Sequence, residues 1–298
     1  QNHQLVTIDG KIMAIAFMAN AQHLFYRSDI LDKAGVAAPT SYEDVLAAAK
    51  AIKSAGLMEH PFAFNSAPGW NLGEEFVNMY MGTGADFFKP GTAEVSINNE
   101  HGIATLNMMK ALTEYSNPDF LTFNSDATQA LWEAGDLALA TFWGTRAGPI
   151  LDGEGSTEAV TSTTVVASAP FLGGGPRPSS TLWWDGFSIA SNVSDADAEA
   201  SFIAMMNGIS KDMVMANNDL AVWLIDGYQA SASSAGVSAT AQNGAAPYPM
   251  LPFMGTLHGA AGGELSEFLQ GSESAEQALA DVEAAYTAAA KEKGFLSN

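Results

Sequence analysis

The first strong hydrophobic pattern of the chain lies between Gly10 and Gly35. Residues 11–19 are apolar apart from Lys11 and contain neither proline nor glycine, so they predict a buried strand that stops at Asn20. A second apolar stretch covers residues 23–26 and leads into a short helix that Gly35 ends. Small and amide side chains interrupt the pattern within residues 18–22. The interruption fits a chain that crosses from one lobe to another and leaves a polar side chain in the cleft; one bent strand is the alternative.

The rest of the pattern alternates between helices and strands, which favours α/β layers. Thr40 and Glu43 predict a capping box at the start of the first long helix. The three prolines within residues 247–252 exclude a helix or central strand there and suit another crossing. The predicted helices cover residues 40–56, 72–81, 98–115, 125–134, 194–209, 213–223, 259–269 and 274–291, and the predicted strands cover residues 61–64, 137–142, 163–169 and 181–190.

Composition sets the class of protein. The chain has 298 residues, of which 47% are hydrophobic and 15% charged, so it is long enough for two domains and apolar enough for a packed core. The absence of cysteine excludes disulfides and cysteine-bound zinc. A net charge of −21 argues against binding to nucleic acid or to anionic membranes. No stretch approaches the ~18 apolar residues of a membrane span, so a membrane-spanning protein is not expected.

Catalytic and metal-binding motifs are not found in the sequence. The five histidines show no metal-ligand spacing, and no nucleophile elbow of the form Gly-x-Ser-x-Gly occurs. Most of the acidic residues fall on predicted helix faces or near helix N-termini, and no local pair is marked out for glycoside hydrolysis. We therefore predict no catalytic residue, no metal site and no cofactor.

Tryptophans at the ends of strands are the most distinctive feature. Trp70, Trp143, Trp183 and Trp184 lie beside glycine, asparagine, aspartate or threonine in predicted polar breaks. An indole ring covers the apolar face of a sugar while neighbouring amides and carboxylates bind its hydroxyls, so these residues predict a sugar site. Core packing is the alternative for each of them. Because adjacent residues of a strand face opposite ways, only one of Trp183 and Trp184 enters a cleft.

The remaining tryptophans, Trp132 and Trp223, lie in predicted helices and are expected in the core.

A series of short motifs resembles the extracellular solute-binding proteins of ABC sugar importers, the maltose-binding-protein-like group. The motifs are residues 10–12 (GKI), 24–35 (LFYRSDILDKAG), 39–44 (PTSYED), 135–139 (GDLAL) and 271–279 (GSESAEQAL). Ala16 stands where that family usually has proline. Each motif is weak alone, but their order along nearly the whole chain is specific.

The resemblance implies an α/β, two-lobed periplasmic-binding-protein fold of type II, the maltose-binding kind, with its first lobe truncated. Residues 1–19 and 187–246 are expected to form a remnant of the first lobe, and residues 20–186 and 247–298 the second lobe. Roughly 100 residues of the first lobe are expected to be missing, about one small domain. Apolar residues of 11–19 and 187–190 should therefore be exposed or covered by another chain.

The function implied is that of the substrate-binding component of an ABC transporter. Such a protein captures a mono- or oligosaccharide between its lobes, closes by hinge bending and delivers the sugar to a permease in the inner membrane, without catalysis. The expected location is the periplasm, after export by a signal peptide that this chain lacks.

By resemblance, Asn20 falls where the family places a polar sugar contact, and Trp70 lies in the loop with a stacking ring. Arg146 stands near the family's usual tryptophan in the loop after Trp143, and suggests a different sugar or one with a carboxylate; an ion pair is the alternative for Arg146. Asp185 completes the predicted site.

Three other functions remain open. A polyamine or another cationic ligand would suit the acidic charge, with Asp185 as the clear carboxylate candidate. A glycoside-active enzyme would need two carboxylates at the cleft. A structural or adhesive surface protein would need no cleft.

Overall fold

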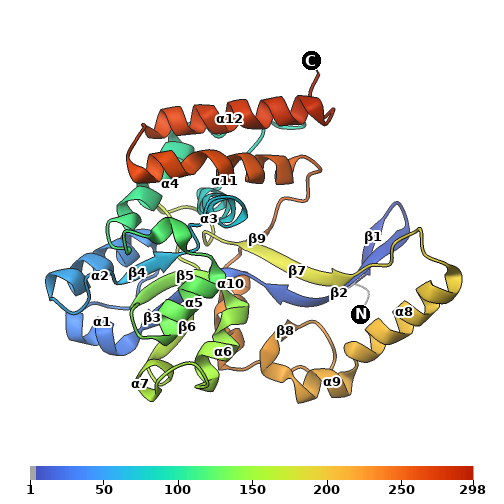
Figure 1. The fold of residues 1–298 in the computed structure, drawn as a ribbon, viewed down its shortest axis with the longest axis horizontal. Coiled ribbons are helices and arrows are strands. Elements are labelled where there is room, and N and C mark those ends of the chain that lie inside the picture. Colours follow the sequence, from blue (N-terminus) through green and yellow to red (C-terminus); the bar gives the residue numbers. More distant parts are fainter. Residues whose placement is uncertain (1–4, 298) are drawn as a thin grey trace.

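The computed structural model describes residues 5–297 and contains two separate β-sheets (Figure 1). The first sheet has the order β1 (Leu5–Ile8), β2 (Lys11–Asn20), β7 (Thr181–Phe187) and β9 (Ala246–Pro247), with β8 (Val222–Trp223) also paired to β2. The second sheet has the order β4 (Phe62–Phe64), β5 (Leu139–Trp143), β3 (Gln22–Arg27) and β6 (Thr164–Ala167). Strands and helices alternate along the second sheet, as the hydrophobic pattern predicts.

The helices of the described residues are α1 (Ser28–Ala34), α2 (Tyr42–Ser54), α3 (Trp70–Gly82), α4 (Glu100–Thr113), α5 (Ser125–Glu133), α6 (Ala147–Asp152), α7 (Glu158–Thr161), α8 (Asp195–Gly208), α9 (Lys211–Ala216), α10 (Ala235–Gln242), α11 (Met254–Gln270) and α12 (Ala275–Glu292). Short 3₁₀ turns cover Phe120–Thr122, Gly144–Arg146, Asn218–Leu220 and Ala232–Ser234.

The first change from one sheet to the other takes place over a single residue, Ala21. Asn20 is the last residue of β2 and Gln22 the first residue of β3, and Ala21 between them is fully buried. The break lies inside the interruption that the sequence marks at residues 18–22. The two flanking strands therefore belong to different sheets rather than to one bent strand.

The second sheet carries the main core. Along β3, Leu24 belongs to a hydrophobic cluster with α2, α3, α4, α11 and α12, and Phe25 belongs to a second cluster with α5 and α6. Successive side chains of a strand point to opposite faces, so both faces of this sheet are covered. Trp132 lies fully buried in the second cluster, as expected for a core tryptophan.

The first sheet is thinly covered by comparison. Strands β2 and β7 run side by side away from the main body toward β1 and α8 (Figure 1). Ile12 and Met13 of β2 are 58% and 53% exposed, and α8 has no buried side chain. The expected exposure of apolar residues is observed at Ile12, Met13 and Ile189, whereas Ala16 is buried.

Some local predictions are wrong. The capping box of α2 uses Ser41 and Asp44 rather than Thr40 and Glu43, one residue further along. The helix predicted at residues 213–223 ends at Ala216, and Trp223 instead lies in β8, paired with Met18 of β2. Trp223 is half-buried there, so it is not the helical core residue that the pattern predicts.

Strand β7 bears on the predicted division into lobes. All of β7 from Thr181 to Phe187 lies in the sheet of β1 and β2, although the sequence-based boundary places residues 181–186 in the second lobe. The lobe boundary at residues 186/187 remains a prediction. Strand β7 itself lies on the connection between the first sheet and the main body.

Candidate functional site

Aromatic side chains meet where the chain changes from one sheet to the other. The ring centroids of Trp70 and Trp143 lie 5.9 Å apart, those of Trp70 and Trp183 5.9 Å, and those of Trp143 and Trp183 6.2 Å. Tyr248 adds a fourth ring, 4.3 Å from that of Trp183. We call Trp70, Trp143, Trp183 and Tyr248 the aromatic cluster. Trp70 is 50% exposed, so this cluster is open to solvent.

Each ring of the aromatic cluster comes from a different segment. Trp70 is the first residue of α3, Trp143 the last residue of β5, and Trp183 lies in β7. Tyr248 follows β9 between two prolines, and its backbone N–H donates to the carbonyl of Leu182 at 3.1 Å. The cluster therefore joins elements of both sheets.

Asn20 lies beside the cluster. Its Cα is paired with that of Trp183 across β2 and β7. Its Nδ2 lies 3.4 Å from Oγ1 of Thr145, and its Oδ1 accepts the N–H of Ala21 at 3.0 Å. The amide of Asn20 thus links the end of β2 to the turn after Trp143. Asn20 is the residue for which the sequence predicts a polar sugar contact.

Polar residues of α3 fasten the crossing strands to this site. Trp70, Glu74 and Asn78 follow one another at intervals of four residues and so lie along one stripe of the helix. Asn78 donates to Oε1 of Gln22 at 3.2 Å and accepts the N–H of Thr181 at 2.7 Å. The stripe therefore binds both β3 and β7.

Glu74 is the most unusual residue of this stripe. It is fully buried, and its Oε1 lies 3.0 Å from the indole nitrogen of Trp183 and 2.9 Å from the hydroxyl of Thr181. That hydroxyl also lies 2.9 Å from the indole nitrogen and 2.7 Å from Oδ1 of Asn78, so the hydrogens of this group are shared. Burial raises the pKa of Glu74 to about 7, and the hydrogen bonds from Thr181 and Trp183 oppose that rise. The next residue, Glu75, is buried as well; desolvation, with Glu74 nearby, raises its pKa well above the usual range.

His258 of α11 completes the surroundings of the cluster. Its ring lies 5.0 Å from that of Trp70, its Nε2 lies 2.8 Å from the carbonyl oxygen of Trp70, and its Nδ1 lies 3.1 Å from the hydroxyl of Tyr248. Burial lowers the pKa of His258. The imidazole therefore holds two residues of the aromatic cluster by hydrogen bonds.

Sequence reasoning missed Glu74, Tyr248 and His258. A signal was present for Glu74, because two adjacent glutamates interrupt an otherwise apolar helix that leaves no face for solvent. Tyr248 lies in the predicted proline-rich crossing, where the sequence gives no sign that its ring faces the site. His258 gave no signal, since its partner Trp70 is 188 residues away in the sequence.

Two predicted site residues, Arg146 and Trp184, lie differently from the cluster. Arg146 donates to Oδ1 of Asp126 at 2.8 Å and to Oε1 of Gln129 at 2.9 Å, so its guanidinium is held by α5. The ion pair that the sequence left open is thus present, and a contact of Arg146 with a ligand remains a prediction. Trp184 is 39% exposed and follows Trp183 in the strand, so it faces the opposite side.

Asp185 shares the strand face of Trp183 and is exposed, with a pKa raised by partial burial. It is therefore the predicted carboxylate that can reach a ligand on the cluster side of β7.

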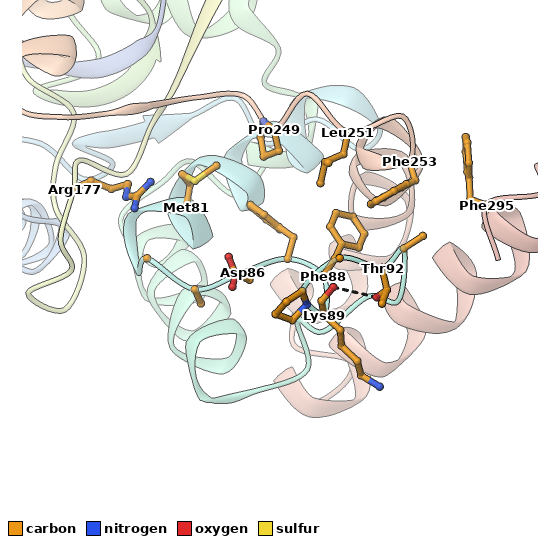
Figure 2. Close-up of a pocket in the computed structure, with 16 residues that line it drawn as sticks. Met81, Asp86, Phe88, Lys89, Thr92, Arg177, Pro249, Leu251, Phe253 and Phe295 are labelled. Atoms are coloured by element: carbon orange, nitrogen blue, oxygen red, sulfur yellow. Dashed lines mark hydrogen bonds between the residues drawn. The ribbon is translucent and has the colours of Figure 1, made fainter.

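A separate hollow of about 750 Å³ lies beside the proline-rich segment (Figure 2). Phe88, Leu251 and Phe253 line it, with Arg177 at one end, and none of the predicted site residues is among its lining. Polar hydrogen-bonding groups converge on the aromatic cluster instead, which is why we take the cluster as the candidate site. Within residues 5–297, no group of three or more histidine, aspartate or glutamate side chains is placed to hold a metal ion.

Comparison with known proteins gives a family. The family described as bacterial extracellular solute-binding protein matches residues 4–208. A relative from Deinococcus radiodurans, a probable ABC transporter-binding protein, is 23% identical over 195 residues, which are 63% of this chain. The matched part is 44% of that relative, so the chain spans less than half its length.

Solved structures show the same fold. A solute-binding protein from Agrobacterium radiobacter K84 in complex with ribitol has a TM-score of 0.82 and 20% identity, with coverage of 96% of this chain and 73% of that chain. A maltose-bound protein from T. maritima has a TM-score of 0.80 and 19% identity, with 97% and 76% coverage. A protein from Agrobacterium vitis S4 with bound D-mannitol has a TM-score of 0.79 and 20% identity, with 97% and 75% coverage. The likeness confirms the predicted maltose-binding-like fold. Within the described residues, no helix is long and apolar enough to cross a membrane.

Proposed function

The chain belongs to the bacterial extracellular solute-binding proteins, and from this premise we propose that it binds a sugar or sugar alcohol at the aromatic cluster. In this proposal it is the substrate-binding component of an ABC importer, works in the periplasm and hands its ligand to a permease of the inner membrane. The similar structures were solved with ribitol, maltose and D-mannitol, ligands of the class that we propose.

The geometry of the aromatic cluster is the observation that carries the proposal. Indole rings at 5.9 Å and 6.2 Å from one another present apolar surface at the junction of the two sheets. Asn20 at one edge and the carboxylate of Asp185 on the same strand face as Trp183 supply groups for hydroxyls. A carbohydrate ring needs this combination of an apolar platform and a polar rim.

The origin of these side chains connects binding to closure. Trp183 and Asn20 belong to the first sheet, whereas Trp70 and Trp143 belong to elements packed on the second sheet. A ligand shifts an open–closed equilibrium only when it binds the two states with different affinity, which a ligand that contacts elements of both sheets can do. Glu74 and His258 hold aromatic rings in this proposal, and the protein does not catalyse a reaction.

A cationic ligand such as a polyamine is the second candidate. The observation in its favour is the exposed carboxylate of Asp185 next to indole rings in a chain with a net charge of −21. Indole faces attract ammonium groups as well as sugar rings. The same experiment separates the two ligand classes.

The test is calorimetric titration of mono- and oligosaccharides, sugar alcohols and polyamines into the wild-type chain and into a matched pair of variants. Trp183→Ala should weaken sugar binding at least about tenfold, because stacking and burial are both lost. Trp184→Ala changes the neighbouring residue on the opposite strand face and should bind like the wild type. Binding of polyamines alone would support the second candidate, and equal affinity in both variants would refute a role of the aromatic cluster.

A further inference from the structure

The carboxylate of Glu74 is linked to the ligand site by a direct bond. Its Oε1 lies 3.0 Å from the indole nitrogen of Trp183, whose N–H is shared with Oγ1 of Thr181 at 2.9 Å. The hydroxyl of Thr181 lies 2.9 Å from the same Oε1 and 2.7 Å from Oδ1 of Asn78. Among the described residues, Oε2 has no hydrogen-bond partner. The nearest basic group is Nδ1 of His258, 3.7 Å from Oε2. A buried carboxylate therefore has one oxygen that fixes a ring of the aromatic cluster and one that faces an imidazole.

Hydrogen bonding fixes the proton on His258. The carbonyl of Trp70 can only accept, so Nε2 of His258 carries the hydrogen at 2.8 Å from it. In the neutral imidazole, Nδ1 then has a lone pair, which accepts the hydroxyl of Tyr248 at 3.1 Å. Two further rings of the aromatic cluster are thus held through His258, and an acceptor nitrogen faces the free oxygen of Glu74.

An ion pair between these residues would fit their distance, but burial favours the neutral form of each. The pKa of Glu74 is raised to about 7 and the pKa of His258 is lowered, both chiefly by desolvation. The other ionisable groups that face Glu74 are Glu75 on the same helix and Tyr248 from the segment after β9. Neither group is a base, so neither supplies a positive charge that would compensate for an ionised Glu74. Strand β7 contributes Thr181 and Trp183, which do not ionise near neutral pH.

We propose that Glu74 is a positioning residue of the ligand site, whose carboxylate anchors the indole of Trp183 while His258 anchors Trp70 and Tyr248, so that ligand affinity depends on the protonation of Glu74. An ionised carboxylate accepts a shorter and stronger hydrogen bond than a neutral carboxyl group. The indole of Trp183 is therefore held more firmly above neutral pH than below it. Above neutral pH the ring is already ordered before the ligand binds, so binding costs less conformational entropy. This inference rests on the proposed function for its effect on affinity, but the link between Glu74 and Trp183 does not.

The first measurement needs no ligand. Indole N–H signals in two-dimensional ¹H–¹⁵N NMR spectra, assigned with the Trp183→Phe variant, should show one signal that titrates with a midpoint near pH 7, that of Trp183. Glu74→Gln keeps an oxygen acceptor and removes the charge, so this titration should vanish. Glu75→Gln removes the neighbouring buried acid, which accepts the N–H of Asn65 and bonds no indole, and the titration should persist. A Trp183 signal that does not move in the wild type would overturn the proposal, even if Glu74→Gln failed to fold.

The second measurement is calorimetric titration of the best sugar from the ligand screen at pH 5.5 and pH 8.5. The wild type should bind about fivefold more tightly at pH 8.5, the ratio expected when a neutral hydrogen bond becomes charge-assisted. Glu74→Gln should have the same affinity at both values, and Glu75→Gln should keep the wild-type ratio. Equal wild-type affinity at both pH values would overturn the proposal. If no sugar binds the wild type at either pH, the proposed function fails, and the NMR titration alone decides the role of Glu74.

Discussion

At the scale of single residues, the imidazole of His23 is fully enclosed by its neighbours. Its ring stacks on that of Phe25 with centroids 4.6 Å apart, and it is fully buried. A Cβ on Gly236 would lie 2.2 Å from Cε1 of His23, and one on Gly144 would lie 2.9 Å from Nε2. The glycines are required there because any side chain would collide with the ring. Nε2 has no hydrogen-bond partner among the described residues, which favours the neutral ring.

Acid should therefore destabilise the protein through His23. Burial lowers the pKa of His23 from 6.5 to about 4 in the folded state, so between these values the unfolded chain binds more protons than the folded one. The contribution to stability is complete above pH 6.5 and is lost as the pH falls to 4. Its loss amounts to about 3 kcal/mol.

Urea unfolding of the wild type and of His23→Asn at pH 7 and pH 4.5 measures this effect. The variant should lose less stability on acidification than the wild type. His101→Asn, at a half-buried histidine of α4, is the control and should follow the wild type. Parallel losses in all three proteins would show that His23 is not responsible.

Single residues also show what the sequence could and could not predict. Trp70, Trp143 and Trp183 were predicted together because each lies at the end of an element beside polar residues, and the structure brings their rings together. The sequence left open whether Arg146 forms an ion pair, because the pair with Asp126 depends on how the turn after β5 faces α5. The adjacent glutamates mark Glu74 as unusual, but its role depends on Trp183, which is 109 residues away in the sequence.

At the scale of elements, the site depends on the close approach of α3 and α11, which lie next to each other in Figure 1. A Cβ on Gly73 of α3 would lie 2.4 Å from the backbone oxygen of His258 in α11. A Cβ on Gly262 of α11 would lie 1.9 Å from the backbone oxygen of Gly69. These glycines allow the helices to approach until His258 reaches the carbonyl of Trp70 at 2.8 Å.

Gly73→Ala should thus lower the free energy of unfolding and weaken ligand binding together. The clash is with backbone, which cannot rotate away, so the helices must separate at a cost of about 1–3 kcal/mol. Gly259→Ala lies one residue after His258, where a Cβ meets nothing within 4 Å, and should be neutral or stabilising by about 0.5–1 kcal/mol. Thermal and urea unfolding of both variants makes the comparison; equal stability of the two would contradict the packing argument.

Elements were predictable where local pattern and tertiary contacts agree. The strand before Asn20 and the long helices follow from apolar runs and periodicity, and the change of sheet follows from the break in the pattern. The segment after α9 was misread because Trp223 and Val222 extend to pair with Met18 and Ala19 of β2, a contact that no local period encodes. In residues 222–223, pairing with β2 outweighs the helical propensity of the segment.

At the scale of the whole molecule, the two sheets differ in how they are covered. The second sheet is covered on both faces, whereas the helix beside the first sheet, α8, exposes Phe202 and Ile203 at 46% and 52%. The residues of the candidate site lie at the connection between these parts rather than in the core of either. The chain has a net charge of −21, and repulsion between its negative charges grows as carboxylic acids ionise.

The last prediction concerns how stability changes on the alkaline side. The pKa of Glu74 is raised from 4.5 to about 7 in the folded state, and the pKa of Glu75 is raised well above 4.5. The folded protein thus binds more protons than the unfolded chain, so the contribution of both groups is fully present below pH 4.5 and is lost as the pH rises through the folded values. For Glu74 the loss between pH 6.5 and pH 8.5 is about 1 kcal/mol, and Glu75 adds to it.

Urea unfolding at pH 6.5 and pH 8.5 checks this for the wild type, Glu74→Gln and Glu114→Gln. The wild type should lose stability between the two values, and Glu74→Gln should lose about 1 kcal/mol less because its amide does not titrate. Glu114 is an exposed residue that caps the C-terminus of α4, so Glu114→Gln should follow the wild type. A loss in Glu74→Gln as large as that of the wild type would mean that Glu74 does not titrate in the folded protein over this range. Its bond to Trp183 would then have the same strength at both pH values, and affinity for the ligand would not respond to this carboxylate.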